Sequence, residues 1–529
     1  MMSTVKELEM LFKKGKISRR VFLKRMSAFS AAAIASPALL TGGARAAAPR
    51  KGGRLRLGLD GGSTTDSLDP AKSTSTMTHV ICHGQLYNNL VEIDHTGTPI
   101  PELAESWEST PDAAQWTFKL RRGVEFHNGK PFDAEDVLFT INYHRGETSK
   151  SGAKGVVKPI REMAAHDKHT ITFILEEGNA DFPFLLSDYH LGIVPNGTTD
   201  TNRGIGTGGY KLIEFEPGVR AVTKRNPNYW KTGRAHFDEV ESLSITDINA
   251  RLTALKTNRI DYMSRVDTKI AELLKKESGI ELVNITGTYH NSMPMLTDVA
   301  PFDNNDVRLA LKYVIDREAL VRIVLRGYGA LGNDHPIGPN QRFFASELPQ
   351  REFDADKANF HLKKAGLGGY TFRLHAAEGV FPGSLDTAVL YKEHAAKANI
   401  NIEVVREPID GYWKNVWMKK PWCMCYWGGR PTADWMFSAV YASGVDWNDT
   451  HWKHERFDML LKSARSELDE NKRREMYVEM QRLVRDEGGV VIPMFPNILE
   501  ASADTLRHGS IASNWTLDGF RLPERWWFA

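Results

Sequence analysis

Residues 101–137 contain the stretch on which the prediction of the fold depends. It reads Pro101-Glu-Leu-Ala-Glu-Ser-Trp107, and then Trp116-Thr-Phe-Lys-Leu-Arg-Arg-Gly-Val-Glu-Phe-His-Asn-Gly-Lys-Pro-Phe-Asp-Ala-Glu-Asp-Val137. Four further blocks follow it in order: Gly206-Thr-Gly-Gly-Tyr-Lys-Leu212 with Asn226-Pro-Asn-Tyr-Trp230, Pro301-Phe-Asp303 with Val307-Arg-Leu-Ala-Leu311 and Ile315-Asp-Arg-Glu318, Phe353-Asp-Ala-Asp-Lys-Ala358, and Gly488-Gly-Val-Val-Ile-Pro493. The five blocks together span residues 101–493, so they bear on most of the chain.

In this order, the five blocks resemble the motifs of the family 5 solute-binding proteins, the class that carries peptides, opines and nickel for ABC importers. The block 353–358 is similar to the family's Asp-Pro-x-Lys-Ala motif, with the proline replaced by Ala355. The resemblance implies an α/β fold of the periplasmic-binding-protein type II. That fold has two lobes joined by a hinge and, as in cluster C, an extra inserted subdomain.

Local patterns agree with an α/β class. From Asp306 to Leu325, apolar residues recur at helical spacing, and Asp316 can cap a second helix there. Residues 469–487 also place apolar side chains on one helical face, between Asp469 and two glycines. Runs rich in β-branched residues, such as 170–175 and 400–405, favour strands. Helices and strands mix without a strict repeat, which is typical of a mixed α/β architecture.

The resemblance also places the domain limits. Lobe I is expected at about 50–308, with the inserted subdomain near 83–208. Lobe II is expected at 309–495, and residues 496–529 are expected to return to lobe I. A length of 529 residues is too great for one ordinary core, which independently favours two or three domains.

The first 46 residues read as a twin-arginine signal peptide. Ser18-Arg19-Arg20-Val-Phe-Leu-Lys24 precedes an apolar run from Met26 to Leu40, and Ala44-Arg-Ala46 suits a signal peptidase. Cleavage is expected after Ala46, with Ala48 as the second choice, and an uncleaved amphipathic anchor is the alternative. No later stretch approaches the roughly 20 apolar residues that a membrane span needs. The mature protein is therefore expected outside the cytoplasmic membrane, in the periplasm.

The charge distribution argues against nucleic acid as a partner. Nine of the 68 basic residues lie within residues 1–46, against two of the 66 acidic residues. The remainder holds 59 basic and 64 acidic residues, a formal net charge of −5. Phosphate backbones require clustered positive charge, which a mildly acidic chain does not supply.

The three cysteines do not indicate a disulfide framework or a metal site. Cys423 and Cys425 share one face of the apolar run Trp422-Cys-Met-Cys-Tyr-Trp427, at or beyond bridging distance, and Cys82 is far from them in sequence. We expect free, buried thiols, although sequence alone leaves their redox state open. A Cys-x-Cys metal site would need two more ligands, so no metal and no cofactor is predicted.

The sequence gives no motif for catalysis. It lacks a metalloprotease helix motif, a nucleophile elbow and a phosphate-binding loop. The glycine-rich stretch 204–209 leads into a strand-like segment rather than a helix, which disfavours a dinucleotide site. His127 lies in a turn that is structural in the resembled family. An exported hydrolase remains an alternative, because its nucleophile and base could meet only in three dimensions.

The segment Tyr426-Trp-Gly-Gly-Arg-Pro-Thr-Ala-Asp-Trp-Met-Phe437 is the candidate wall of a small-molecule site. Rings supply stacking faces, glycines allow close approach, and a guanidinium is a forked donor for an anion. In peptide-binding relatives an aspartate near this point takes the peptide amine. Here Arg430 stands at or near that position, which favours a ligand with a carboxylate, sulfonate or phosphate.

Further side chains of this segment are candidates beside Arg430. Asp434 could hold an amine, so that the pair grips a zwitterion such as an acidic peptide, an opine-like conjugate or a cell-wall fragment. The alternative is an internal Arg430–Asp434 bridge that shapes the loop. Trp427 and Trp435 are the first stacking candidates, Gly428 lies between the ring and the guanidinium, and Trp417 is a weaker candidate that could equally be core.

The other side of the cleft is expected to contribute Tyr289, His290 and Asn291, just before the apparent crossing into lobe II, and His79. His290 would also suit a metal chelate, but no ligand cluster accompanies it in sequence.

The resemblance thus predicts a non-enzymatic binding component of an ABC importer, a monomer that closes two lobes on a small polar, acid-bearing ligand and delivers it to a membrane permease. An opine, an oligosaccharide or a metal chelate is the alternative ligand.

Overall fold

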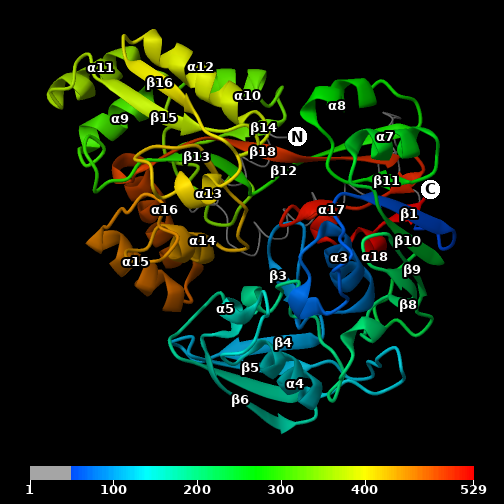
Figure 1. Ribbon diagram of the computed structural model, residues 1–529. Coiled ribbons are helices and arrows are strands. Elements are labelled where there is room, and N and C mark those ends of the chain that lie inside the picture. Colours follow the sequence, from blue (N-terminus) through cyan, green and yellow to red (C-terminus); the bar gives the residue numbers. More distant parts are fainter. Residues whose placement is uncertain (1–48) are drawn as a thin grey trace, which may run out of the picture. The chain divides into compact units, whose positions relative to one another are not determined.

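The computed structural model describes residues 49–529, which form one compact unit. The predicted signal residues Arg19, Arg20 and Ala46 lie outside the described residues. The described chain is a mixed α/β structure with two lobes (Figure 1). None of its helices combines the length and the apolar character that crossing a membrane requires.

Strand β18 (Val490–Ala503) runs through both lobes. Its first part pairs antiparallel with β13 (His290–Pro294) and β14 (Gly329–Leu331), and its second part pairs with β11 (Tyr262–Met263) and β12 (Ile280–Thr286). Because β12 and β13 follow one another along the chain, the two lobes are crossed by β18 and by the β12–β13 segment. Figure 1 shows β18, in red, extending between them.

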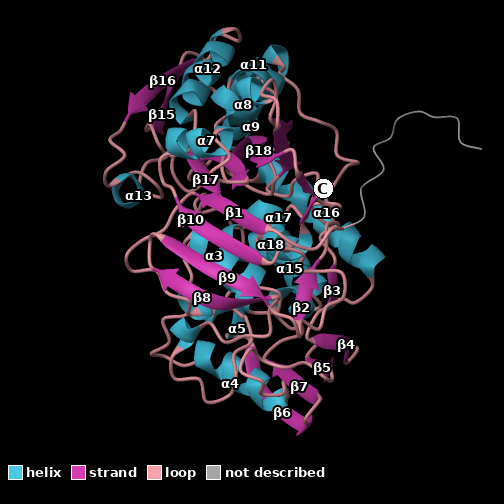
Figure 2. Cartoon of the chain, turned by 90° about the vertical axis from the view of Figure 1, so that its right-hand side faces the viewer, coloured by secondary structure: helices cyan, strands magenta, loops and turns pink. Residues whose placement is uncertain are grey.

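The first lobe is built on the larger part of the central sheet, where β1 pairs parallel with β10 and β11, while β9 and β8 extend the edge antiparallel. Figure 2 shows β1, β10, β9 and β8 side by side in this order. Its buried core includes Leu55, Leu57, Val240, Tyr262 and Trp526. Its remaining elements are β1 (Arg54–Leu59), α3 (Thr76–Ile81), β8 (Tyr210–Glu216), β9 (Arg220–Arg225), β10 (Glu239–Ser244), α7 (Ile248–Lys256), α8 (Thr268–Leu274), β19 (Leu506–Arg507), α17 (Thr516–Gly519), α18 (Leu522–Arg525) and β20 (Trp527–Phe528).

An insertion in the first lobe forms a separate four-stranded antiparallel sheet of order β4-β5-β7-β6. Phe118, Phe173 and Phe182 form its aromatic core, and Asp133 caps its long helix together with Asp136. The fold-deciding stretch 101–137 thus becomes two strands and the start of a helix. The elements here are β2 (Val91–Ile93), β3 (Pro99–Pro101), β4 (Ala104–Ser109), β5 (Gln115–Leu120), α4 (Ala134–His144), α5 (Lys154–Val157), β6 (Ile160–Asp167), β7 (Thr170–Leu175) and α6 (Phe182–Leu185).

The second lobe is mainly helical and encloses two apolar clusters. The parallel pair β15–β16 supports one cluster, and helices α14, α15 and α16 surround the other. Its elements, beside β13 and β14, are α9 (Asn305–Tyr313), α10 (Arg317–Ile323), α11 (Ala355–Lys364), β15 (Thr371–Ala376), α12 (Ser384–Ala396), β16 (Asn401–Arg406), α13 (Tyr412–Asn415), β17 (Cys425–Trp427), α14 (Ala433–Val440), α15 (Glu455–Ser466) and α16 (Glu470–Glu487).

The predicted helix ends and thiols are confirmed. Asp316 caps α10 by accepting from the Ala319 amide at 2.8 Å, and Asp469 caps α16. Cys82, Cys423 and Cys425 are free and buried. The run 422–427 is less regular than expected, since only its last three residues form a strand, while Trp422 and Cys423 make isolated bridges.

The predicted lobe limits stay predictions. The described cores divide the chain earlier than residue 308, because Met293, Phe302 and Val307 pack in one cluster with residues of α10, α11 and α12.

A buried charge network ties the C-terminal segment to the first lobe. Arg521 pairs with Glu102 at 2.7 Å and with Glu524 at 2.8 Å, and Lys231 pairs with Glu92, Glu102 and Glu524 at 2.6–2.9 Å. All five side chains are almost fully buried. Removing one partner would leave a buried charge uncompensated, so the network favours a single arrangement of the segments that supply it.

Glu500, on β18, is a buried carboxylate with no basic partner among residues 49–529. It accepts hydrogen bonds from the Tyr262 hydroxyl at 2.7 Å, from the Thr516 hydroxyl and from the Leu517 amide at 3.1 Å. Burial raises the pKa of Glu500 from 4.5 to about 7, against these donors. The folded protein therefore holds a proton here that the unfolded chain releases above about pH 4.5.

This difference predicts a pH-dependent stability. Between pH 4.5 and pH 7 the folded state binds more protons than the unfolded chain, so stability falls as pH rises through this window. Chemical unfolding of the mature protein should show that Glu500→Gln removes about 3 kcal/mol of this decline. The exposed Glu393→Gln is the control and should follow the wild type. A pH profile of Glu500→Gln parallel to that of the wild type would contradict the assignment.

Candidate ligand-binding cleft

The segment predicted as the ligand wall leaves β17 and enters α14 where the lobes meet. Thr432 caps α14 by accepting from the Trp435 amide at 3.1 Å. Gly429 lies against Thr288, in the segment between β12 and β13, where an added Cβ would stand 1.5 Å from the Thr288 hydroxyl oxygen. Only glycine fits this approach, so the loop is fixed against the crossing segment.

Arg430 is a largely desolvated cation without an acidic partner. Its Nη1 donates to the carbonyls of Gly428 at 3.0 Å and Gly429 at 3.4 Å, and no carboxylate of residues 49–529 comes within 4 Å of it. Burial lowers the pKa of Arg430, while Tyr189 and Asp188 of the first lobe act in the opposite direction. Asp188 is already bonded to His190 at 2.7 Å. The guanidinium thus lies within electrostatic reach of the first lobe and has spare donors.

Asp434 does not pair with Arg430, so the internal bridge that the sequence left open is not formed. Its carboxylate lies 3.2 Å from Nε of Arg465 and accepts from Ser438 at 3.4 Å. Burial raises the pKa of Asp434, and Arg465 opposes that shift. Because Arg465 and Ser438 of its own lobe already donate to the Asp434 carboxylate, few acceptor positions of this carboxylate stay open for an amine. Its binding role stays a prediction.

Two of the predicted stacking residues are anchored inside the second lobe. Trp427 and Trp417 both donate their indole N–H to one oxygen of Asp449, at 3.1 and 3.2 Å. Asp449 is buried, and burial raises its pKa to about 6. Trp427 is only 8% exposed. Trp435 packs against the apolar core of the insertion, so it contacts the opposite lobe rather than open space.

The exposed aromatic face belongs instead to Tyr426, the neighbour of Trp427. Tyr426 is 37% exposed and stacks on Tyr289 with ring centroids 5.1 Å apart, and Trp413, 41% exposed, meets it at 5.6 Å. Successive side chains of a strand point to opposite faces, which explains why Tyr426 is exposed where Trp427 is buried. Sequence reasoning predicted Tyr289 but missed Tyr426 and Trp413, although both lie in the same aromatic-rich stretch.

The first lobe presents an aromatic cluster that contains the predicted His79. Its ring lies 4.3 Å from Tyr189 and 4.9 Å from Phe520, and Trp515 stacks on Phe520 at 5.8 Å. Burial lowers the pKa of His79 to about 4. Tyr189 of this cluster is close enough to Arg430 for each to affect the pKa of the other. Tyr189, Trp515 and Phe520 were missed, since they are far from any predicted site residue in sequence.

His290 and Asn291 lie on β13, and both are buried. The ring nitrogens of His290 and His335 and the Asn291 amide have no side-chain partner within the described chain, although the backbone at Thr288 and at Ile337 lies close enough to act on the pKa of His290 and His335. Burial lowers the pKa of His290 to about 3 and that of His335 to about 4. The His335 ring and Arg430 are also close enough to His290 to lower its pKa. Two neutral, buried imidazoles therefore lie near each other, and one of them, His290, is also near Arg430. His335 gave no sequence signal.

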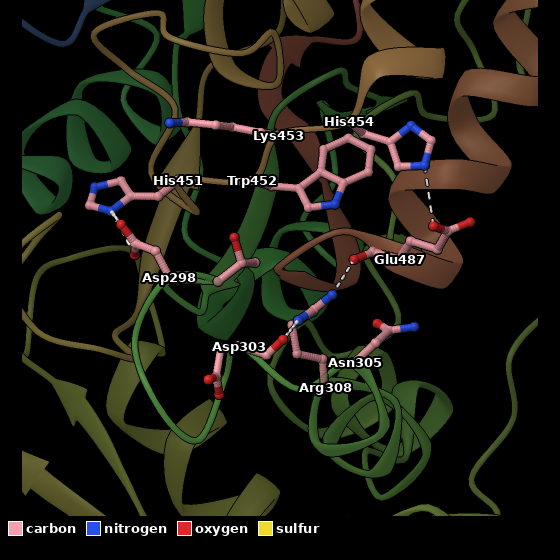
Figure 3. Close-up of a pocket in the computed structure, with 10 residues that line it drawn as sticks. Asp298, Asp303, Asn305, Arg308, His451, Trp452, Lys453, His454 and Glu487 are labelled. Atoms are coloured by element: carbon pink, nitrogen blue, oxygen red, sulfur yellow. Dashed lines mark hydrogen bonds and ion pairs between the residues drawn. The ribbon is translucent and has the colours of Figure 1, made fainter.

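Within residues 49–529 no three His, Cys, Asp or Glu side chains are arranged to hold a metal ion. A separate surface cavity of about 440 Å³ lies in the second lobe (Figure 3). Both of its histidines are paired, His451 with Asp298 at 3.0 Å and His454 with Glu487 at 3.2 Å, and Arg308 bonds to backbone carbonyls. None of the predicted ligand residues lines it.

Comparisons with known proteins agree with this architecture. Residues 98–449 match the family model "Bacterial extracellular solute-binding proteins, family 5 Middle". The dipeptide-binding protein of Escherichia coli is 26% identical over 474 residues, which are 82% of this chain and 88% of the relative. A glutathione-binding protein of Pectobacterium atrosepticum is 24% identical, covering 79% and 84% of the two chains.

A solved structure shows the same fold. The periplasmic binding protein DppA of Helicobacter pylori, in complex with the peptide STSA, superposes with a TM-score of 0.70 at 23% identity, over 91% of this chain and 99% of that protein. The predicted fold class, with two lobes of type II, is confirmed. Because the family model covers well over half of the chain, the protein belongs to the family 5 bacterial extracellular solute-binding proteins, which bind solutes for transport and are not enzymes.

Proposed function

We propose that this protein is the extracytoplasmic binding component of an ABC importer, and that it captures a small polar ligand carrying an acidic group. A peptide-like molecule or an amino-acid conjugate fits this description. The observation that carries the proposal is Arg430, a desolvated guanidinium at the junction of the lobes with no carboxylate of its own.

Desolvation of the guanidinium favours a bound anion. A desolvated guanidinium is costly unless it is paired and hydrogen-bonded, and its planar fork matches a carboxylate, sulfonate or phosphate. Charge-assisted hydrogen bonds of this kind contribute about 1.5–3 kcal/mol each. Gly428 and Gly429 occupy only one of its terminal nitrogens. The other donors are therefore available to a ligand.

A ligand drives closure of the lobes when it contacts both of them at once. Arg430 and Tyr426 supply contacts from the second lobe, and Tyr189 supplies a hydroxyl and a ring from the first. His79 keeps a neutral ring behind Tyr189, since its pKa is about 4. A ligand with an acidic group and an apolar or planar part would match this set.

We further propose export by the twin-arginine route, directed by Arg19 and Arg20 and ended by cleavage after Ala46, and a monomeric protein that hands its ligand to a membrane permease. The extracytoplasmic role of the family and the sequence pattern of residues 1–46 support this part of the proposal.

A thermal-shift screen over peptides, opines and sugars should identify an acidic ligand, and calorimetry should then measure its affinity. Arg430→Ala should weaken binding about 30-fold or more, because it removes the cation that pairs with the acid. Arg430→Lys should retain part of the affinity. The control is Arg406→Ala, at an exposed residue with no side-chain hydrogen bond or ion pair in the described chain. Unchanged affinity of Arg430→Ala would refute the anionic-ligand proposal.

A metal chelate is the second candidate, favoured by the neutral imidazoles of His290 and His335, whose ring nitrogens have no side-chain partner among residues 49–529. Neutral imidazole is a good ligand for nickel, copper and zinc, and a chelating small molecule would complete the coordination shell. Titration with nickel in the presence of excess histidine should then give binding that both His290→Gln and His335→Gln reduce at least about tenfold. If the wild-type protein gives no heat with this mixture, the chelate candidate is withdrawn and the acidic ligand stands alone.

A further inference from the structure

The short helix α6 of the insertion contacts the second lobe through a buried ion pair. Asp181, at its N-terminal end, places Oδ1 2.8 Å from Nη2 of Arg473 and 3.3 Å from Nη1 of Arg342. The side chains of Asp181 and Arg473 are only 3% and 1% exposed. The two arginines belong to the second lobe and Asp181 to the first, so this is a contact between lobes.

Further contacts between the two lobes surround the ion pair. The Ala180 amide donates to the Arg465 carbonyl at 2.7 Å, and the Arg342 guanidinium lies 5.1 Å from the centre of the Phe184 ring. Trp435 packs on the insertion core beside them. The two lobes thus share a hydrogen bond, a cation–π contact and apolar packing around the buried charges.

The facing charges are balanced. Asp434 and Glu470 accompany Asp181, and Arg465 accompanies the two arginines, so three acids meet three bases. Asp434 pairs with Arg465, and Glu470 pairs with Arg342 at the exposed rim. Loss of the Asp181 charge would leave the buried Arg473 with a hydrogen bond to the Ala464 carbonyl at 3.1 Å and, among residues 49–529, with Glu470 at 3.9 Å as its remaining ion-pair partner.

Within its own lobe, the Asp181 carboxylate makes no helix cap and no ion pair among the described residues. The aspartates at the start of α4, α7 and α16 cap their helices, whereas Asp181 makes no side-chain cap to α6. Its backbone amide instead donates to Asn179 at 2.9 Å. All ion pairs of the Asp181 side chain therefore cross to the second lobe.

The Asp181 ion pair lies where it can hold the two lobes together. Figure 1 shows the insertion on the side of α14–α16 that lies away from β18, the strand that crosses the lobes. Tyr189, whose pKa responds to Arg430, follows α6 closely in the chain, and Asp434 and Trp435 directly follow the Arg430 loop. The ion pair thus adjoins the candidate cleft without contributing any predicted ligand contact.

We propose that Asp181 is an interlobe latch, which through Arg473 and Arg342 stabilises the closed arrangement of the two lobes, so that a fraction of the protein is closed before a ligand binds. The latch goes beyond the proposed function, because it depends on the two-lobe fold and not on the ligand's chemistry. Its consequence for binding is that ligand release requires this ion pair to open, so Asp181 slows dissociation without touching the ligand.

The test measures the distance between the lobes in ligand-free protein. Spin labels on Lys154→Cys, in the insertion, and on Lys462→Cys, in α15, report this distance by double electron–electron resonance. Both lysines are exposed, and the three native cysteines are buried. Asp181→Asn keeps the shape of the side chain and removes its charge. Glu177→Gln is the matched control, since Glu177 lies in the same loop, is exposed and makes no side-chain bond in the described region.

The wild type and Glu177→Gln should show the same short interlobe distance beside a longer one, and Asp181→Asn should lower the ratio of short to long distances at least about tenfold. Arg342→Ala, which spares the buried Arg473, should give a smaller shift in the same direction. Identical distributions in the wild type and Asp181→Asn would overturn the latch. Because no ligand is used, this result is separate from the ligand screen, whose failure would bear only on the proposed function.

Discussion

The backbone pairing of β18 is the constraint on which the two-lobe arrangement depends. Gly329 to Leu331 of the second lobe pair with this strand up to Pro496, and Thr286 of the first lobe pairs with the next residue, Asn497. The strand therefore changes lobes between two adjacent residues. Backbone hydrogen bonds on both sides fix its register, so relative movement of the lobes is limited to rotation about this point and the neighbouring segment 287–289.

This constraint positions the candidate site. Thr288 lies in the second crossing segment, and the close approach of Gly429 to it holds the Arg430 loop at the pivot. Tyr289, next in the chain, stacks on Tyr426 of the same wall. The latch at Asp181 lies on the far side of the second-lobe helices from β18. The pivot lies at one side of the candidate site and the Asp181 ion pair lies at the other. A ligand would therefore be enclosed between them.

Much of the fold could be predicted from the sequence, because caps and periodic apolar residues act locally. Asp316 and Asp469 marked their helices, and the ordered motifs indicated the family. The site was harder. Trp427 and Tyr426 are adjacent in an aromatic run, and a run without polar alternation does not reveal which face is buried. Asp434 looked available, but its partner Arg465 becomes its neighbour only after α14 and α15 pack together. Tyr189 comes near Arg430, and His335 comes near His290, through tertiary structure alone.

The most direct measurement of the central claim is mass spectrometry of the small molecule that co-purifies with the exported protein, released by mild denaturation. The account predicts an intact small molecule with at least one carboxylate, sulfonate or phosphate group, bound in a one-to-one complex. A ligand that carries no acidic group, or a molecule that the purified protein converts into a product, would contradict it.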